Sequence, residues 1–423
     1  MKITQLSLTD FRGIRSLLLD LSDLPVAIFI GKNGAGKSSV LDAAAIALTR
    51  ITAQLGASGA GKRHLLPTDI HNKQMSTSVK IGVEHHGEQY TWELTRRGRN
   101  AKKQEVEHLI SRLDDVKKLA SALGNDLSGE TNNVPLLAYY PVNRAVLDIP
   151  LKIRVTHDFN PLDAFEGALT RAANFRVFFE WFRNREDFEN EQRRDIPSFI
   201  DPSLEAVRKA IQTFMHGCTN LRVRRKPLLR MTINKAGEEV LISQLSDGEK
   251  CLLALVGDLA RRLAIANPHS TEPLSGQGVV LIDEIELHLH PAWQRNVVNQ
   301  LKTTFPNCQF LISTHSPQVL GDGVGASVYA ITPKSDDPDN MENRLAPVGN
   351  LYGADSNRIL DEIMGAGTRA SEVSESFKEL FLQIELKNWQ RVTEISTLLA
   401  EKIDHDDPDL LKARMLVRLK GGN

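Results

Sequence analysis

The sequence predicts a mixed α/β fold built on a largely parallel sheet. Short, continuous apolar runs at residues 26–30, 279–282 and 310–312 are typical of strands buried on both faces. A glycine-rich or polar segment follows each run, and helical patterns come next along the chain. Strands that alternate with helices in this way indicate a parallel sheet covered by helices.

The elements around these strands divide the chain into four expected segments. Residues 1–99 begin with strands at 3–8 and 16–21 and contain a hairpin around His86 and Gly87, which predicts the first part of an α/β lobe. Residues 100–220 are mostly charged or aromatic and helical, so we expect a mainly helical insertion that is too short for an extended coiled coil. Residues 221–334 return to strands and helices, and residues 335–423 begin with a polar linker at 335–340 and form a C-terminal helical unit.

The composition excludes several classes of protein. The 423 residues include 52 basic and 53 acidic side chains, so net charge does not draw the whole chain to nucleic acid or to a membrane. The 3 cysteines lack the spacing of a metal or disulfide site, which suits a reducing compartment. Because no apolar run approaches ~20 residues and the start does not resemble a signal peptide, we expect a soluble, cytoplasmic protein with no membrane partner.

The segment after the first buried strand has the chemistry of a phosphate-binding loop. Residues 31–38 are GKNGAGKS and fit the pattern G-x-x-x-x-G-K-[ST] between a strand and a helix, the context that this motif requires. Gly34 and Gly36 leave room for backbone N–H groups to approach phosphate oxygens at a helix N-terminus. We expect Lys37 to reach the β- and γ-phosphates of ATP and Ser38 to bind Mg²⁺.

Two carboxylates follow the buried strand at 279–282. A parallel strand brings Asp283 to the carboxyl edge of the sheet, where ligands bind, so we expect it to hold Mg²⁺ together with Ser38. Glu284 comes next and is expected to polarise the attacking water as a general base. A strand that ends in acidic residues is common by itself, and the pairing with the loop at Lys37 is what favours this role.

Residues 245–250, LSDGEK, open a helix and resemble the signature of ABC ATPases, with Asp247 in place of the first of two glycines. In ABC proteins this segment meets the γ-phosphate held by a second protomer. The resemblance therefore implies a head-to-tail homodimer in which Ser246, Gly248 and Glu249 contact the nucleotide. The alternative is a simple capped helix in which Ser246 and Glu249 form a capping box.

A histidine follows the buried strand at 310–312, within the run FLISTHS. His315 stands where ABC ATPases carry the switch histidine, and the resemblance assigns it a contact with the γ-phosphate. Together with Lys37 and Glu284 it completes the expected catalytic set. A histidine at the end of a strand is otherwise usually structural.

Three segments resemble the RecF, SMC and overcoming-lysogenisation group of ABC ATPases. They are residues 8–13 (LTDFRG), 33–39 (NGAGKSS) and 283–291 (DEIELHLHP). The resemblance implies an ABC-ATPase head of the P-loop NTPase class, with a D-loop at 286–290 that crosses the dimer interface. It also implies a set of nucleotide contacts, namely Arg12, Asn33, Gly34, Ala35, Gly36, Lys37, Ser38 and Ser39. His288 and His290 have the spacing of metal ligands, but no cysteine or further histidine clusters near them in the sequence and we favour no metal there.

Two shorter segments, 138–144 (AYYPVNR) and 351–360 (LYGADSNRIL), resemble the ATPase subunit of Septu anti-phage systems. That resemblance implies an HNH endonuclease partner, action of the complex on DNA, and a sensor or scaffold role for the ATPase. No Q-loop glutamine is identified, and the corner from Tyr140 to Arg144 is its substitute. No Toprim-like series of acidic residues follows His315, so we expect no nuclease site in this chain.

Two other functions stay open. One is a RecF-like DNA-binding repair ATPase without a nuclease subunit, and the other is an interaction protein that binds ATP without hydrolysing it. Basic clusters at 96–103 and 222–226 could contact a phosphate backbone, although solvated strand edges are the commoner explanation. Apolar stripes at 377–384 and 410–419 predict packed helices, and we expect this tail to recruit the partner.

Overall fold

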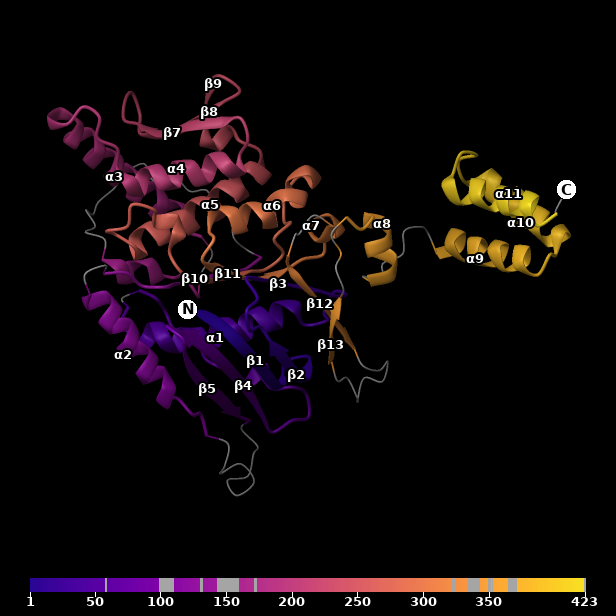
Figure 1. The fold of residues 1–423 in the computed structure, drawn as a ribbon, viewed down its shortest axis with the longest axis horizontal. Helices are drawn as coiled ribbons and strands as arrows, with labels where there is room; N and C mark the ends of the chain where they lie inside the picture. Colours follow the sequence, from indigo (N-terminus) through magenta and orange to yellow (C-terminus); the bar gives the residue numbers. More distant parts are fainter. Residues whose placement is uncertain are drawn as a thin grey trace. The chain divides into compact units, whose positions relative to one another are not determined.

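The chain folds into two compact units, Met1–Asp355 and Ser356–Asn423. The first contains three β-sheets and the second is helical (Figure 1). The structure is a computed structural model, and it describes residues 1–57, 59–98, 110–129, 132–142, 160–170, 173–321, 325–333, 343–348, 351, 353–363 and 371–421.

The central sheet of the first unit has strand order β13-β12-β3-β11-β10-β6. Neighbouring strands are parallel except β13, which pairs antiparallel with β12 at one edge. The strands are β3 (Val26–Ile30), β6 (Leu136–Tyr140), β10 (Gly278–Ile282), β11 (Cys308–Ser313), β12 (Ser327–Pro333) and β13 (Asn343–Val348). Every residue of β3, β6, β10 and β11 is buried, which explains their continuous apolar sequences and confirms the predicted parallel core.

Two antiparallel sheets accompany this core. The four-stranded sheet has the order β2-β1-β4-β5 and the three-stranded sheet the order β7-β8-β9. Their strands are β1 (Lys2–Phe11), β2 (Ile14–Asp20), β4 (Ser76–His85), β5 (Glu88–Arg97), β7 (Cys218–Arg224), β8 (Arg230–Lys235) and β9 (Glu238–Leu241). The predicted hairpin is confirmed, since His86 and Gly87 join β4 to β5 with His85 opposite Glu88.

Helices cover both faces of the central sheet. Figure 1 shows α4, α5 and α6 on one face, and α1 with the four-stranded sheet on the other. The α-helices of this unit are α1 (Lys37–Gln54), α2 (Asp114–Ser128), α3 (Phe175–Asp195), α4 (Pro202–Phe214), α5 (Asp247–Ala266), α6 (Pro291–Thr304) and α7 (Pro317–Gly321). Short 3-10 turns are η1 (Pro67–Asp69), η3 (Pro161–Phe165), η4 (Ile242–Gln244) and η5 (Pro273–Ser275). Residues 251–266 of α5 are all buried, so this helix forms part of the core.

The second unit consists of short helices around its own core. They are α8 (Ser356–Arg358), the π-turn η6 (Ile359–Ile363), α9 (Ser371–Glu385), α10 (Trp389–Lys402) and α11 (Pro408–Leu419). The buried cluster is Phe377, Leu380, Ile384, Val392, Ile395, Leu399, Leu410 and Ala413. Most of the predicted stripe at 377–384 therefore packs internally, whereas Leu411, Met415 and Leu419 on α11 are exposed.

Two strands lie in segments where the sequence predicted something else. β6 belongs to the central sheet, although residues 100–220 were expected to be a mainly helical insertion; its five apolar residues are of the same kind as β10, but helical patterns flank them on both sides. β13 lies beyond residue 334 and extends the sheet by one edge strand, so the first unit ends at Asp355. Among the described residues, no helix is long and apolar enough to span a membrane.

Candidate nucleotide-binding site

The loop between β3 and α1 has the shape of a phosphate cradle. Gly34 and Gly36 have φ angles of 81° and 106°, in the left-handed region that glycine adopts without strain. Gly31 is required for another reason, because a Cβ there would lie 2.5 Å from the backbone oxygen of Ile331 in β12. Exposure varies along the loop: Asn33 and Gly34 are exposed, Ala35, Gly36, Ser38 and Ser39 are half-buried, and Lys37 is buried. The backbone at its tip is thus accessible to an anion.

Lys37 lies across this loop rather than in solvent. Its Nζ donates to the backbone oxygens of Gly31 and Lys32, at 2.9 and 3.2 Å, and the residue is only 5% exposed. Burial lowers the pKa of Lys37, while the charges of Asp283, Glu284 and Glu286 act in the opposite direction. An ammonium group therefore stands between the loop and three carboxylates, where it can contact phosphate oxygens.

Ser38 and Asp283 lie side by side, as the sequence predicts. The Ser38 hydroxyl donates to Asp283 Oδ1 at 3.1 Å, and Ser313 at the end of β11 donates to the same oxygen. Asp283 is 3% exposed and follows β10, so two neighbouring strands and the helix α1 meet at this carboxylate. A hydroxyl and a carboxylate at this spacing suit a magnesium ion, which binds through one or two such oxygens and retains water and phosphate ligands.

Glu284 begins a tight turn after β10. Its φ is 47°, an uncommon conformation for a residue with a side chain, and its backbone N–H donates to Ser313 Oγ at 2.8 Å. Ser313 therefore binds both members of the acidic pair, through its hydroxyl to Asp283 and through its oxygen to Glu284. Uncommon backbone conformations of this kind concentrate at functional sites.

Glu286 holds the segment that contains His315. Its Oε1 accepts the backbone N–H of His315 at 2.5 Å, and its Oε2 accepts the hydroxyl of Thr314 at 2.7 Å. The sequence placed Glu286 in a loop that crosses a dimer interface but gave it no partner within the chain. The structure therefore adds a residue that positions the half-buried His315 beside the acidic pair.

Ser246, Gly248 and Glu249 form a second group at the start of α5. Ser246 is the N-cap; its Oγ accepts from the N–H of Glu249 at 3.3 Å, and its own N–H donates to Glu249 Oε2 at 2.9 Å. Glu249 also pairs with Lys235 at 2.7 Å, which helps to lower its pKa against the effect of burial. The capping box is therefore present, and the Glu249 carboxylate is engaged by Ser246 and Lys235.

Gly248 brings this helix start against the predicted D-loop. A Cβ on Gly248 would lie 2.4 Å from the backbone oxygen of His288, so only glycine fits. His290 serves as the N-cap of α6, where its Nδ1 accepts the N–H of Ala292 at 3.3 Å. His290 thus has a structural role as a helix cap, and the absence of a metal at His288 and His290 stays a prediction.

Arg12 lies beside α1, one helical turn beyond Ser38. Its Nη1 donates to Asp42 Oδ2 at 2.5 Å and its Nε to Asp69 Oδ1 at 2.8 Å. Burial alone lowers the pKa of Arg12, but the two carboxylates raise it overall. Asp42 also pairs with Arg63 at 2.6 Å. The guanidinium predicted to face the nucleotide is therefore bound to two acidic side chains near the loop.

Tyr140 connects the acidic pair to α5. Its backbone oxygen accepts the N–H of Asp283 at 2.9 Å, and its hydroxyl donates to Asp258 Oδ2 at 3.0 Å. Asp258 pairs with Arg261 and Arg262, each at 2.7 Å, and all three charged groups are buried. Although burial opposes ionisation, the two guanidinium groups hold the pKa of Asp258 at about 2. Of the predicted Q-loop substitute, residues 143 and 144 lie outside the described residues.

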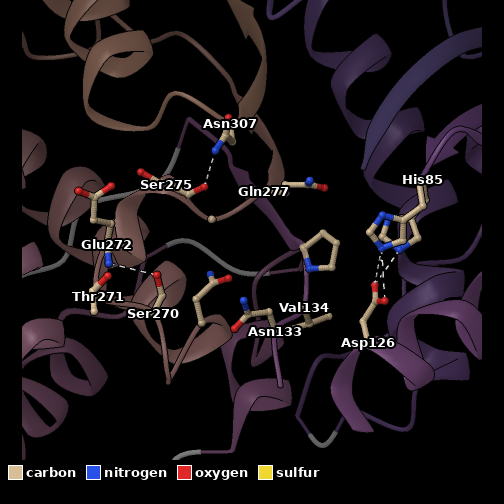
Figure 2. Close-up of a pocket in the computed structure, with 14 residues that line it drawn as sticks. His85, Asp126, Asn133, Val134, Ser270, Thr271, Glu272, Ser275, Gln277 and Asn307 are labelled. Atoms are coloured by element: carbon tan, nitrogen blue, oxygen red, sulfur yellow. Dashed lines mark hydrogen bonds and ion pairs between the residues drawn. The ribbon is translucent and has the colours of Figure 1, made fainter. Parts of the chain in front are cut away.

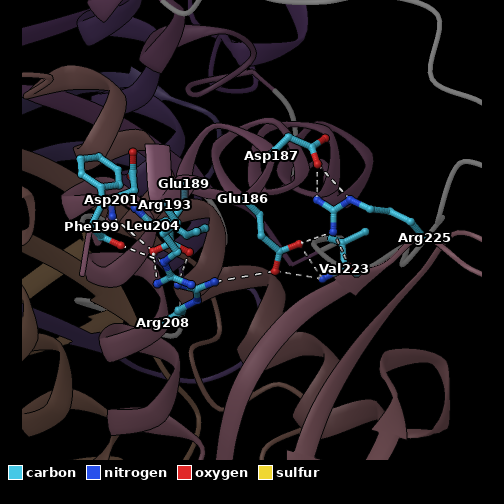
Figure 3. A network of polar contacts seen from close by, with 10 residues as sticks. All are labelled: Glu186, Asp187, Glu189, Arg193, Phe199, Asp201, Leu204, Arg208, Val223 and Arg225. Carbon is cyan, nitrogen blue, oxygen red and sulfur yellow. Dashed lines mark hydrogen bonds and ion pairs between the residues drawn. The ribbon is translucent and has the colours of Figure 1, made fainter. Parts of the chain in front are cut away.

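The basic cluster at 222–226 is largely ion-paired. Arg222 and Arg224 both contact Glu239, and Arg225 contacts Glu186 and Asp187 of α3. Figure 3 shows the Arg225 guanidinium facing Asp187 and Glu186, and the neighbouring network of Glu189 with Arg208 on the other side of Glu186. These pairs balance part of the positive charge of the cluster. Most of the other cluster, residues 99–103, lies outside the described residues.

Comparison with known proteins places this site in a family. Residues 26–321 match the family described as "AAA domain, putative AbiEii toxin, Type IV TA system". The chain belongs to this family. This member of the family carries a phosphate loop after β3 and an acidic pair after β10.

Named relatives of this AAA-domain chain include retron and Septu proteins. It is 31% identical over 409 residues to "Retron Vc95 probable ATPase" of Vibrio cholerae, covering 85% of this chain and 78% of that protein. It is 26% identical over 482 residues to "Retron Ec83 probable ATPase" of Escherichia coli, covering 98% of this chain and 86% of that protein. "Septu protein PtuA" of Bacillus mycoides is 23% identical over 75% of this chain and 38% of its own length. The Septu kinship that the sequence predicts is thus confirmed, whereas the retron relatives were not foreseen.

Solved structures similar to this chain include an SMC head domain from Thermotoga maritima. The two share 16% identity at a TM-score of 0.45, over 82% of this chain and 99% of that one.

Proposed function

We propose that this protein hydrolyses ATP with Mg²⁺ and serves as the sensor or scaffold subunit of a cytoplasmic anti-phage complex, together with an HNH endonuclease that acts on DNA. One observation carries the ATPase part. The Ser38 hydroxyl lies 3.1 Å from Asp283, with the buried ammonium of Lys37 beside them and His315 fixed by Glu286. These are the groups that phosphoryl transfer requires, and they come from adjacent strands of one sheet.

Each residue has a role in this chemistry. Backbone N–H groups at residues 33–36 and Lys37 bind the phosphates, and Ser38 and Asp283 hold the magnesium ion, which would neutralise charge on the β- and γ-phosphates. Glu284 accepts a proton from the attacking water as general base. His315 donates a hydrogen bond toward the γ-phosphate from a loop that Glu286 keeps in place.

The second protomer completes the site. In the proposed head-to-tail homodimer, Ser246 and the N-terminus of α5 approach the γ-phosphate bound by the partner, where helix N–H groups favour an anion. The Asp247 side chain at this helix start is 86% exposed, so the surface is open to a partner. Gly248 lets the start of α5 pack closely against the D-loop backbone at His288. The two segments expected at the dimer interface therefore lie next to each other.

The partner assignment rests on kinship and on the second unit. Relatives of this chain carry retron and Septu names, and the Septu kinship is what suggests the HNH endonuclease. We assign recruitment of that subunit to the second unit, because Leu411, Met415 and Leu419 on α11 are 42%, 68% and 82% exposed. The ion pairs at Arg222, Arg224 and Arg225 argue against the alternative of a repair ATPase that binds DNA by itself.

The test is purification from the native host with a tag on this chain, followed by mass spectrometry and phosphate-release assays. A stoichiometric HNH-type nuclease supports the defence complex, and its loss after removal of residues 356–423 supports recruitment by the second unit. A chain that purifies alone, or with repair proteins, contradicts the partner assignment but leaves the ATPase proposal standing. Absence of phosphate release by the complex contradicts hydrolysis and favours an interaction protein that only binds ATP.

A further inference from the structure

Two histidines and an aspartate, none of them part of the nucleotide site, lie close together. His85 Nε2 lies 2.9 Å from Asp126 Oδ2, and His86 Nε2 lies 3.3 and 3.2 Å from the two Asp126 oxygens. One ligand atom from each of the three residues lies within 4.8 Å of the others. Figure 2 shows the Asp126 carboxylate directly facing the His85 ring. The groups come from the β4–β5 hairpin and from the last turn of α2.

The hairpin turn places both imidazoles on the same side. Successive residues of a strand normally face opposite sides. His86 departs from that rule with a φ of 51°, and the two ring centroids lie 4.1 Å apart. A two-residue turn of this type favours Asn before Gly, so the turn itself does not call for histidine at this position. The arrangement is therefore better explained by what the two rings bind.

The burial of His85 and the position of Asp126 on its helix also bear on this group. His85 is 2% exposed, and its Nδ1 has no hydrogen-bond partner among the described residues. Asp126 lies in the last turn of α2, where the helix dipole disfavours a negative charge. Its ion pairs are with these two imidazoles. A carboxylate at a helix C-terminus that faces two imidazole nitrogens favours a nearby cation.

We propose that His85, His86 and Asp126 bind one divalent transition-metal ion, with Zn²⁺ as the ion to test. Zinc binds imidazole nitrogen and carboxylate oxygen at about 2.0–2.2 Å, so ligand atoms of a tetrahedral site lie about 3.3–3.5 Å apart. The observed separations of 2.9–3.3 Å between imidazole nitrogens and carboxylate oxygens are close to that spacing. Two imidazoles with one carboxylate form a ligand set that zinc uses with a fourth, exchangeable position.

The fourth position opens onto a polar cavity of about 520 Å³. Figure 2 shows Glu272 and Asn307 on the side of this cavity opposite His85, with Gln277 between. Water or a small oxygen ligand fits such a lining. The bound ion would also tie the β4–β5 hairpin to α2, which gives the site a structural effect independent of ATP.

The test uses the full chain, freed of metal by a chelator and kept without nucleotide. Calorimetric titration with Zn²⁺ is expected to give one tight site per chain, and titration with Co²⁺ to give the visible absorption of a low-symmetry imidazole site. His86→Asn keeps the turn favourable, and Asp126→Asn keeps the side-chain shape. Each is expected to weaken Zn²⁺ binding about 100-fold or more, because loss of groups that merely support metal ligands already costs about 10–100-fold.

Three controls make the result decisive. His405→Asn, at an exposed histidine of the second unit, should bind Zn²⁺ like the wild type. His315→Asn should do the same, which separates this site from the nucleotide site. Zn²⁺ should raise the melting temperature of the wild type but not of His86→Asn, while both melt alike in chelator. Wild-type protein that binds no Zn²⁺, or variants that bind it as tightly as the wild type, would overturn the proposal.

Discussion

The carboxylate of Glu286 accepts the backbone N–H of His315 at 2.5 Å and so joins the loop after β10 to the loop after β11. Because the same carboxylate also binds Thr314, the histidine backbone is fixed by a residue that does not have to contact substrate. We predict that Glu286→Ala lowers kcat for ATP by about 10–100-fold, the equivalent of hydrogen bonds to a charged group worth about 1.5–3 kcal/mol. Steady-state phosphate release should show KM changed far less than kcat. An equal rise in KM with constant kcat would instead assign Glu286 to nucleotide binding.

Glu284→Gln should abolish turnover while ATP binding is kept. Removal of a general base typically costs about 10²–10⁴-fold in rate. The measurement is single-turnover phosphate release, combined with size exclusion in ATP to detect a trapped dimer. Glu238→Gln, an exposed acid on β9, is the matched control and should hydrolyse ATP at the wild-type rate. If Glu284→Gln also released phosphate normally, another group would have to serve as base.

Substitutions of two glycines in helices should have opposite effects. Gly248→Ala places a methyl group 2.4 Å from the His288 oxygen and should lower the free energy of unfolding by about 1–3 kcal/mol, with a loss of ATP turnover. Gly124→Ala meets no atom within 4 Å in the interior of α2 and should raise the free energy of unfolding by about 0.5–1 kcal/mol. Urea titrations of both variants test the pair. If Gly248→Ala left the free energy of unfolding unchanged, the backbone at His288 would have to shift without cost to make room for the methyl group.

Stability at acidic pH should depend on Asp258. Folding lowers the pKa of this carboxyl from 3.8 to about 2, chiefly through Arg262 and Arg261 acting against burial. A lowered pKa contributes stability that is present above pH 3.8 and lost as the pH falls through about 2. We predict that Asp258→Asn destabilises the protein by about 3–5 kcal/mol at pH 7, since two buried guanidinium groups lose their partner.

The difference in free energy of unfolding between the wild type and Asp258→Asn should decrease by about 2 kcal/mol from pH 4 to pH 2. This is about the size of the pKa change converted to free energy. Tyr140→Phe removes one hydrogen bond to Asp258 and should cost about 1–3 kcal/mol at pH 7. Denaturant unfolding at several pH values measures both effects. A difference in free energy of unfolding that stays constant from pH 4 to pH 2 would mean that Asp258 does not gain its proton in that range.

The sequence alone predicted which residues lie together when they are neighbours in the chain or follow adjacent strands of the central sheet. Lys37, Ser38, Asp283 and His315 follow strands whose apolar runs are easily recognised, and parallel strands bring their carboxyl ends together. Glu286 could not be given its role from sequence, because its contact with His315 spans 29 residues and depends on how two loops turn. A turn with a left-handed residue, such as that at Glu284, is not encoded by any local pattern.

Partners that are distant in sequence account for the other differences. The ion pairs of Arg12 with Asp42 and Asp69 were not expected from the sequence, and its contact with the nucleotide stays a prediction. β6 was missed because one short apolar run between helical segments does not reveal that it pairs with β10, about 140 residues later. The approach of His85 and His86 to Asp126 likewise requires the packing of a hairpin on a helix.

The close approach of Gly31 to the backbone of Ile331 places the start of the phosphate loop against β12. On its way to residues 356–423 the chain passes through β12, which is hydrogen-bonded along β3, and then through β13, which pairs antiparallel with β12. Ile331 of β12 presses its backbone oxygen against the first residue of the loop that ends β3. The backbone that cradles the phosphates therefore adjoins β12, and the edge strand β13 follows β12 before the chain reaches the second unit.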